Sequence, residues 1–325
     1  MAAIARLPVS IVTPVYNGAR HLVECIESVL GQTYADFEYV IADNASTDDS
    51  LAIARRYADR DHRVRVIACE DHLSNHIANW NRALSHVNPT VRYVKVLHAD
   101  DWLFEECVER MVELAERHPS VGIVGAYRLD HDRVTLDGLP LSVDVLPGAA
   151  VARSFLLGGP LPFLFGSPSS LLLRAGVIEA HQPFYDEEVL HADNDACMRV
   201  LEDSDFGFVH QVLTYTRRHE TAISTLRVNR IGTHVPNKID LFQRWGHIFL
   251  SKDEYDRKLF VLLLYYSAWL ATSVRKWPLR EFRTYHRERM RRILERTSPR
   301  ELARGFGLQV RQTVMSSGRS RQRAT

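Results

Sequence analysis

Short apolar runs alternate with helical patterns along the first part of the chain. The runs at 9–15, 38–42, 64–68 and 93–97 have the length and the β-branched content of buried strands. In the segments between them, apolar residues recur every three or four positions, which is the spacing of a helix with one buried face. Strands that alternate with helices predict an α/β fold, with a central, mostly parallel sheet flanked by helices and wound by right-handed crossovers.

The pattern changes after residue 119. A further strand is predicted over 121–125, a loop-rich segment punctuated by Gly and Pro covers 127–160, and a strand or strand pair is expected over 206–216. The remaining residues read as helices. The nearly uncharged run at 259–274 is shorter than the roughly 20 residues that span a bilayer, so it predicts a buried or interfacial helix.

These changes of pattern define the expected domain organisation. An α/β domain is expected first, followed by a basic helical extension and a short disordered tail. The expected boundaries are 1–230 for the α/β domain, with halves at about 7–119 and 120–230, then 231–312 for the helical extension and 313–325 for the tail.

Two adjacent carboxylates, Asp100 and Asp101, directly follow the strand at 93–97. Open α/β sheets place their ligand crevice at the carboxyl ends of their strands. Paired carboxylates there suit Mg²⁺ or Mn²⁺ holding a diphosphate, because these ions take oxygen ligands and share them with phosphate. The alternative is structural: Asp100 would cap a helix that starts near Trp102, and Asp101 would complement its dipole. A second structural expectation is a capping box at Ser46 and Asp49.

Composition and charge narrow the classes of protein to which this chain can belong. The chain is 46% hydrophobic, and its four cysteines form no CxxC pair, so neither a disulfide framework nor a zinc site is predicted. No secretory signal is expected at the N-terminus, which favours a cytoplasmic location. Residues 251–325 contain 18 Lys and Arg against 7 Asp and Glu. This basic end suits anionic lipid, nucleic acid or an acidic partner, or is simply a solvated helical face.

Three segments together resemble the family 2 glycosyltransferases of the GT-A fold. They are TPVYN at 13–17, ADNASTD at 42–48 and HADDW at 98–102, in the family's order, and the resemblance covers roughly residues 7–225. It implies that the first two segments bind the nucleoside of a nucleotide-sugar. It further implies that the acidic turn binds the diphosphate through Mg²⁺ or Mn²⁺.

Site residues follow from the resemblance position by position. Asp43 would accept a hydrogen bond from the base, which suits the imide N–H of uracil or thymine without excluding guanine. The sequence departs from the family's pattern at Trp80, His98 and Ala192, where the family has Arg, Asp and Glu. The implied nucleotide-sugar-binding residues are Thr13, Pro14, Tyr16, Asp43, Asn81, His98, Asp100 and Arg218, and the implied metal ligands are Asp100, Asp101 and His219.

The catalytic residue is expected in HADNDACMRVL at 191–201. The resemblance makes Asp193 the general base, and Asp195 and Arg199 also match the family's pattern. One carboxylate suffices to deprotonate an acceptor hydroxyl while the diphosphate leaves on the opposite face. The alternative for Asp193 is an N-cap of the following helix, and one residue can serve both roles.

The implied function is inverting transfer of a sugar, with a UDP-sugar favoured as donor, to an acceptor hydroxyl. The acceptor would be a glycan, a lipid-linked compound or a small molecule, in polysaccharide, glycolipid or other glycoconjugate synthesis. The alternatives are a donor-binding but inactive relative and a nucleic-acid- or membrane-binding protein that acts through the basic C-terminal region. Peripheral contact with the cytoplasmic face of a membrane and oligomer formation are both left open.

Overall fold

The structure, a computed structural model, describes residues 9–137, 139–158, 165–218 and 230–322. The chain divides into two compact units, Met1–Arg218 and His219–Thr325. The first unit contains the sheet and the second is helical, so each is considered by itself below.

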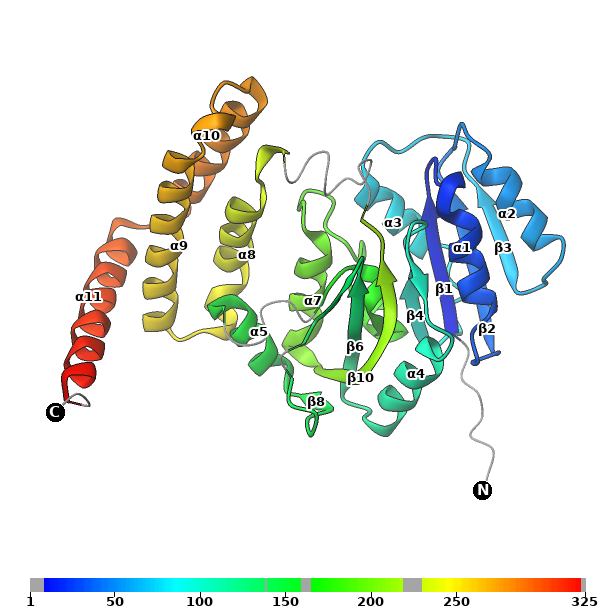
Figure 1. The fold of residues 1–325 in the computed structure, drawn as a ribbon, viewed down its shortest axis with the longest axis horizontal. Helices are drawn as coiled ribbons and strands as arrows, with labels where there is room; N and C mark the ends of the chain where they lie inside the picture. Colours follow the sequence, from blue (N-terminus) through cyan, green and yellow to red (C-terminus); the bar gives the residue numbers. More distant parts are fainter. Residues whose placement is uncertain (1–8, 138, 159–164, 219–229, 323–325) are drawn as a thin grey trace. The chain divides into compact units, whose positions relative to one another are not determined.

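A mixed, mostly parallel sheet forms the centre of the first unit (Figure 1). Its strand order is β3-β2-β1-β4-β9-β6-β10-β5. Neighbours from β3 to β4 run parallel, β9 is antiparallel to both β4 and β6, and β10 is parallel to β6. The predicted fold class is therefore confirmed. The strands are β1 (Val9–Val15), β2 (Phe37–Asp43), β3 (Val64–Ala68), β4 (Tyr93–Val96), β5 (Trp102–Leu103), β6 (Val121–Asp130), β7 (Arg133–Thr135), β8 (Val145–Leu146), β9 (Leu172–Arg174) and β10 (Asp205–Thr216).

Amphipathic helices bury their apolar stripes against this sheet. The stripe of α1 includes Leu22, Ile26 and Val29, all fully buried in the main core together with residues of β1 and β2. Burying a side chain of this size stabilises the fold by about 1.5–3 kcal/mol. The helices of this unit are α1 (Ala19–Leu30), α2 (Ser50–Ala58), α3 (His76–Leu84), α4 (Cys107–Arg117), α5 (Gly148–Leu157), α6 (Ala175–Glu179) and α7 (Ala192–Asp203), with a 3-10 turn, η1, at Pro168–Ser170.

The prediction of a helix from near Trp102 was wrong. Trp102 and Leu103 form β5, which pairs antiparallel with Tyr215 and Thr214 of β10, and α4 begins only at Cys107. The Trp102 and Tyr215 rings stack with centroids 3.6 Å apart. Such cross-strand aromatic pairing stabilises a strand at a position where helix propensity is weak. Asp100 consequently does not cap a helix, and the acidic turn lies between two strands.

The predicted capping box at Ser46 and Asp49 was also wrong. Asp49 makes no side-chain capping hydrogen bond to α2. Ser46 Oγ instead accepts the backbone N–H of Asn17 at 3.0 Å, and the Asp48 carboxylate accepts that of Ala19 at 3.0 Å. The side chains of Ser46 and Asp48 thus accept hydrogen bonds from backbone N–H groups that lie 29 positions earlier in the sequence. They hold together the loops that follow β1 and β2.

The second unit consists of helices. These are α8 (His234–Phe249), α9 (Lys252–Thr272), α10 (Arg280–Glu295) and α11 (Pro299–Gln322), with a short 3-10 turn, η3, at Val274–Lys276. The uncharged run lies on α9, whose buried residues include Leu259, Leu262 and Tyr266. Among the described residues, no helix is both long and apolar enough to cross a membrane. The helix α11 ends at Gln322 and so includes part of the segment expected to form the tail, 313–325, a prediction that stays untested.

Candidate active site

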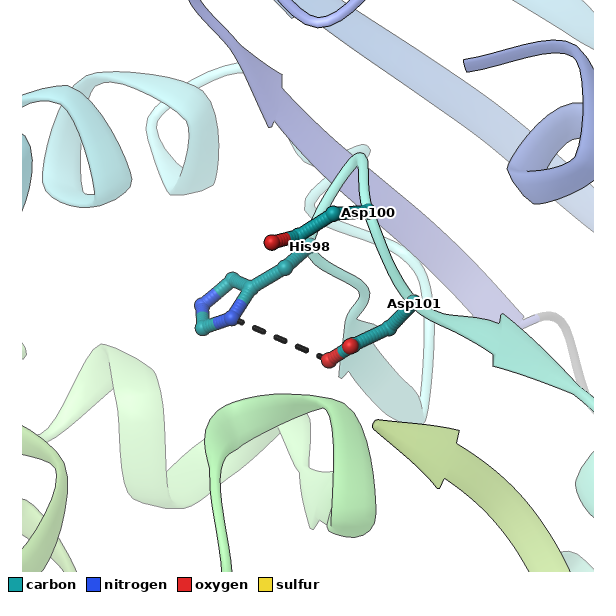
Figure 2. Close-up of side chains that lie close together, drawn as sticks. All are labelled: His98, Asp100 and Asp101. Carbon is teal, nitrogen blue, oxygen red and sulfur yellow. Dashed lines mark ion pairs between the residues drawn. The ribbon is translucent and has the colours of Figure 1, made fainter. Parts of the chain in front are cut away.

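The turn between β4 and β5 brings three potential metal ligands together. Figure 2 shows the side chains of His98, Asp100 and Asp101 on this turn. One ligand atom from each lies within 4.8 Å of the others, and His98 Nδ1 is 4.0 Å from Asp101 Oδ2. Two ligands on opposite sides of one ion with bonds of about 2.1 Å are about 4.2 Å apart, so small side-chain rotations would let these atoms hold a cation. The donor set fits a divalent cation.

Asp101 is the most enclosed member of this group, with 3% of its surface exposed. Its Oδ1 accepts the backbone N–H of Arg217 at 3.1 Å. Burial, and then the neighbouring charge of Asp100, raise the pKa of Asp101 to about 6. A bound cation would stabilise two neighbouring carboxylates, one of them buried, in their ionised form.

A buried lysine, Lys95, is hydrogen-bonded to the segment that contacts the acidic turn. Lys95 of β4 is fully buried, and its Nζ donates to the carbonyl oxygens of Ser169 at 2.9 Å and Leu171 at 3.2 Å. Burial lowers the pKa of Lys95. Ser169 Oγ in turn accepts the backbone N–H of His98 at 3.1 Å. Sequence reasoning did not single out Lys95, although a lysine inside an apolar strand was a visible signal of a buried polar role.

Of the two neighbouring arginines, Arg217 is hydrogen-bonded to the acidic turn, and the charge of Asp101 also acts on Arg218. Arg217 Nε donates to the backbone oxygen of Asp100 at 3.1 Å. Arg218 instead forms a bidentate pair with Asp130, with N–O distances of 2.6 and 2.5 Å. This pair occupies the Nε and Nη2 edge of the guanidinium, so the predicted contact with a phosphate would have to use Nη1 or replace the pair. The predicted metal ligand His219 lies outside the described residues.

The nucleoside side of the predicted site contains one unsatisfied carboxylate oxygen. Asp43 has 1% of its surface exposed, and its Oδ2 accepts the N–H of Ser46 at 3.0 Å. Its Oδ1 is buried and has no hydrogen-bond partner among the described residues. Tyr16 is 46% exposed, and its ring centroid lies 4.1 Å from that of His72. An open acceptor beside a partly exposed aromatic ring suits a nucleobase.

Thr13 and Pro14 contribute to this region through the backbone and core. Both lie in β1, all of whose residues are buried. The Thr13 hydroxyl is hydrogen-bonded to that of Tyr39, with the oxygens 2.9 Å apart. These two residues therefore support the strand from which Tyr16 projects.

Asn81 is occupied by a structural contact. Its Nδ2 donates to the backbone oxygen of Tyr185 at 2.8 Å, and its Oδ1 accepts the backbone N–H of the same residue at 2.9 Å. The Asn81 amide thus joins α3 to the segment before α7. The expected contact of Asn81 with the donor would require these bonds to break.

Asp193 lies in the first turn of α7 and is partly exposed. Asp195, two residues later, is fully buried and pairs with Arg199 at 3.2 Å. Arg199 also donates to the backbone oxygen of Phe184 at 3.4 Å. Asp195 and Arg199 therefore stabilise the helix and the segment before it, and Asp193 is the more accessible carboxylate.

Arg128 of β6 links the acidic turn to α7 electrostatically, and sequence reasoning missed it. Burial lowers the pKa of Arg128, and the carboxylates of Asp130, Asp101 and Asp193 oppose that shift. Arg128 Nη2 lies 3.1 Å from Asp130 Oδ2. Asp101 and Asp193, far apart in the sequence, thus act on the same partly buried guanidinium.

Comparisons with known proteins agree with this arrangement. The family model described as Glycosyl transferase family 2 matches residues 10–175. A putative glycosyltransferase of Bacillus subtilis, EpsE, is 26% identical over 250 residues, which cover 76% of this chain and 85% of EpsE. The chondroitin synthase of Escherichia coli is 33% identical over 139 residues, 41% of this chain but 19% of that enzyme.

Two solved structures share the fold. Residues 1–349 of S. aureus TarS in complex with UDP-GlcNAc align with a TM-score of 0.62 at 17% identity, covering 79% of this chain and 72% of that one. The mannosyltransferase PcManGT of Pyrobaculum calidifontis in complex with GDP-Man and Mn²⁺ aligns with a TM-score of 0.54 at 16% identity, covering 94% and 87%. At these identities the comparison establishes a common fold.

Proposed function

Since this chain belongs to glycosyl transferase family 2, we propose that it transfers a sugar from a nucleoside-diphosphate-sugar to an acceptor hydroxyl with inversion at the anomeric carbon. The observation that carries the proposal is the group of His98, Asp100 and Asp101 at the carboxyl end of β4. A UDP-sugar is the favoured donor, because Asp43 offers a buried acceptor for an imide N–H. The TarS complex with UDP-GlcNAc supports the same choice.

Each part of the proposed reaction is assigned to particular residues of this chain. Asp100 and Asp101 would hold a Mg²⁺ or Mn²⁺ ion, with His219 as a further proposed ligand, and such an ion would supply positive charge to the leaving diphosphate. Asp193 accepts the proton of the attacking hydroxyl. Asp43 and Tyr16 hold the base. Inversion requires no second carboxylate as nucleophile, since the displacement is a single step.

Calorimetric titration tests this proposal. The purified chain is titrated with UDP, TDP and GDP, each with and without Mn²⁺. We expect binding of one nucleotide that depends on the cation. Absence of binding to all three nucleotides under both conditions would contradict the proposal and favour a function of the basic C-terminal region.

Replacing Asp43 with asparagine should weaken nucleotide binding selectively. Asparagine keeps one oxygen for the N–H of Ser46 but presents an amide N–H₂ where the open Oδ1 stood, so two donors face each other. We expect UDP affinity to fall by about 10–100-fold, the size of a lost hydrogen bond to a charged group. The change is measured by calorimetry. Asp49→Asn is the matched control, because Asp49 makes no side-chain capping bond, and equal UDP affinity in Asp43→Asn and wild type would refute this role of Asp43.

We further propose that the acceptor belongs to polysaccharide or other glycoconjugate synthesis and that the second unit attaches the enzyme peripherally to anionic lipid. The connection between α9 and α10 exposes apolar side chains, with Val274 at 67%, Trp277 at 43% and Leu279 at 37%. Exposed Arg275 and Arg280 lie among them in the sequence. Apolar and aromatic residues beside basic ones suit the surface of an anionic bilayer.

Sedimentation with lipid vesicles tests this attachment. The combined variant Val274→Ser, Trp277→Ser and Leu279→Ser should bind vesicles containing phosphatidylglycerol at least about tenfold more weakly than wild type, because each apolar side chain contributes through its buried area. Leu264→Ser is the control, since Leu264 is 60% exposed on α9 outside this connection. Equal sedimentation of wild type and the combined variant would contradict the proposal. Salt-sensitive binding of an oligonucleotide, without vesicle binding, would favour nucleic acid instead.

A further inference from the structure

The His98 ring is held in place by two contacts from other parts of the fold. Its ring stacks on that of Trp80 from α3, with centroids 4.9 Å apart and planes inclined by 29°. The backbone N–H of His98 donates to Ser169 Oγ at 3.1 Å. Trp80 itself packs edge-on against Tyr185 at 5.3 Å, which fixes its position from a third segment. The imidazole therefore lies in a prepared position on the acidic turn.

The surroundings of the two ring nitrogens of His98 indicate that the imidazole binds a ligand. Nδ1 lies 4.0 Å from Asp101 Oδ2, beyond hydrogen-bond distance. Nε2 is buried and has no hydrogen-bond partner among the described residues. Nδ1 is therefore the ring nitrogen that is placed to share a cation with Asp100 and Asp101, while Nε2 lies on the far side of the ring. Figure 2 shows the imidazole on the same side of the turn as both carboxylates.

Imidazole and carboxylate ligands prefer different cations. Mg²⁺ takes oxygen ligands and keeps much of its water, whereas Mn²⁺, Co²⁺ and Zn²⁺ accept an imidazole nitrogen more readily. A site made of one imidazole and two carboxylates is therefore biased against Mg²⁺. Trp80 orients the imidazole, in the way that neighbours of metal ligands commonly do.

We propose that His98 is a direct ligand of the cation at the acidic turn, that Trp80 positions it, and that this pair makes the site select Mn²⁺ and Co²⁺ over Mg²⁺. This inference rests on the proposed cation site of the preceding section, and extends it by naming the ligand that sets cation preference. It also gives one explanation for two unusual residues, Trp80 and His98, which stack on each other although they are far apart in the sequence.

Pulsed electron paramagnetic resonance of bound Mn²⁺ tests the ligand directly. The His219→Gln variant with Mn²⁺ and UDP, in which His98 is the one remaining proposed imidazole ligand, should show a hyperfine coupling to ¹⁴N of a bound imidazole, and the double variant His98→Gln, His219→Gln should lose it. His219→Gln is the matched control, because that histidine is the other proposed ligand, and it should retain a coupling from His98. Circular dichroism of each variant checks that the fold is kept.

Calorimetry tests the preference. His98→Asp, which makes the three ligands on the acidic turn carboxylates, should lower the ratio of the Mg²⁺ dissociation constant to the Mn²⁺ dissociation constant by about tenfold. Trp80→Ala should weaken Mn²⁺ binding without abolishing the ¹⁴N coupling, as expected of a positioning residue. An equal ¹⁴N coupling in the double variant and in His219→Gln, with the wild-type cation ratio in His98→Gln, would overturn the inference alone. Failure of wild type to bind Mn²⁺ with any nucleotide would instead overturn the proposed cation site.

Discussion

Replacing Asp193 with asparagine is expected to lower kcat by about 10²–10⁴-fold, the usual contribution of a general base. Asparagine has nearly the same shape but cannot accept a proton from the acceptor hydroxyl. Because Asp193 is not among the residues proposed to hold the nucleotide or the cation, donor affinity should stay the same. Turnover is measured as UDP released from UDP-GlcNAc and other UDP-sugars, and affinity by calorimetry with UDP and Mn²⁺.

Asp195→Asn separates this chemical role from a structural one. Asp195 is fully buried and paired with Arg199, so its replacement should lower the free energy of unfolding by about 1–3 kcal/mol. Asp193 is partly exposed, and its loss should cost about 0.3–1 kcal/mol of helix-dipole stabilisation. Unchanged turnover in Asp193→Asn would show that Asp193 only stabilises the start of α7. Wild-type protein that binds UDP but releases none from any UDP-sugar would favour the inactive, donor-binding alternative.

Asp100→Ala and Asp101→Asn should each abolish the part of nucleotide binding that depends on Mn²⁺. The cation links the diphosphate to the turn, and either change removes one of its anionic ligands. Binding of UDP measured without a divalent cation should be the same as in wild type, because the base contacts remain. Glu105→Gln, a change at an exposed carboxylate just beyond β5, provides the control. Retained Mn²⁺ dependence in both variants would place the cation elsewhere.

Asp101→Asn also carries a stability prediction that distinguishes loss of the site from loss of the fold. Burial and the charge of Asp100 raise the pKa of Asp101 to about 6, so ionised Asp101 costs free energy of folding above that pH. Asparagine removes this cost and can still accept the N–H of Arg217. In thermal unfolding without metal, the variant should be at least as stable as wild type at pH 7.5. As the pH falls below about 6, Asp101 becomes protonated, and the stability of wild type should rise relative to that of the variant. A variant markedly less stable at pH 7.5 would show that the carboxylate is structurally required.

The local pattern of apolar and polar residues predicted most of the strands and helices of the first unit. The strand Val9–Val15 has the bounds predicted from its apolar run, because a strand buried on both faces must be apolar throughout. The edge strand Val64–Ala68 also has the predicted bounds, although Arg65 and Ala68 are exposed. The acidic pair at Asp100 and Asp101 was identified for a similar reason. Carboxylates at the end of a buried strand are held at the sheet edge by the strand itself, whatever the rest of the chain does.

Only the tertiary structure decided which polar side chains are available for a ligand. Asn81 is satisfied by the backbone of Tyr185, and Arg218 by Asp130, whereas Arg217 reaches the acidic turn. The sequence placed these residues in the correct motifs but could not assign their partners, which lie about 90 to 120 positions away. The spacing at which apolar residues recur depends only on residues that are near one another in the sequence, so the sequence alone is enough to identify it. Pairing of buried polar groups depends on which segments the sheet order brings together, and that order emerges only when the whole unit folds.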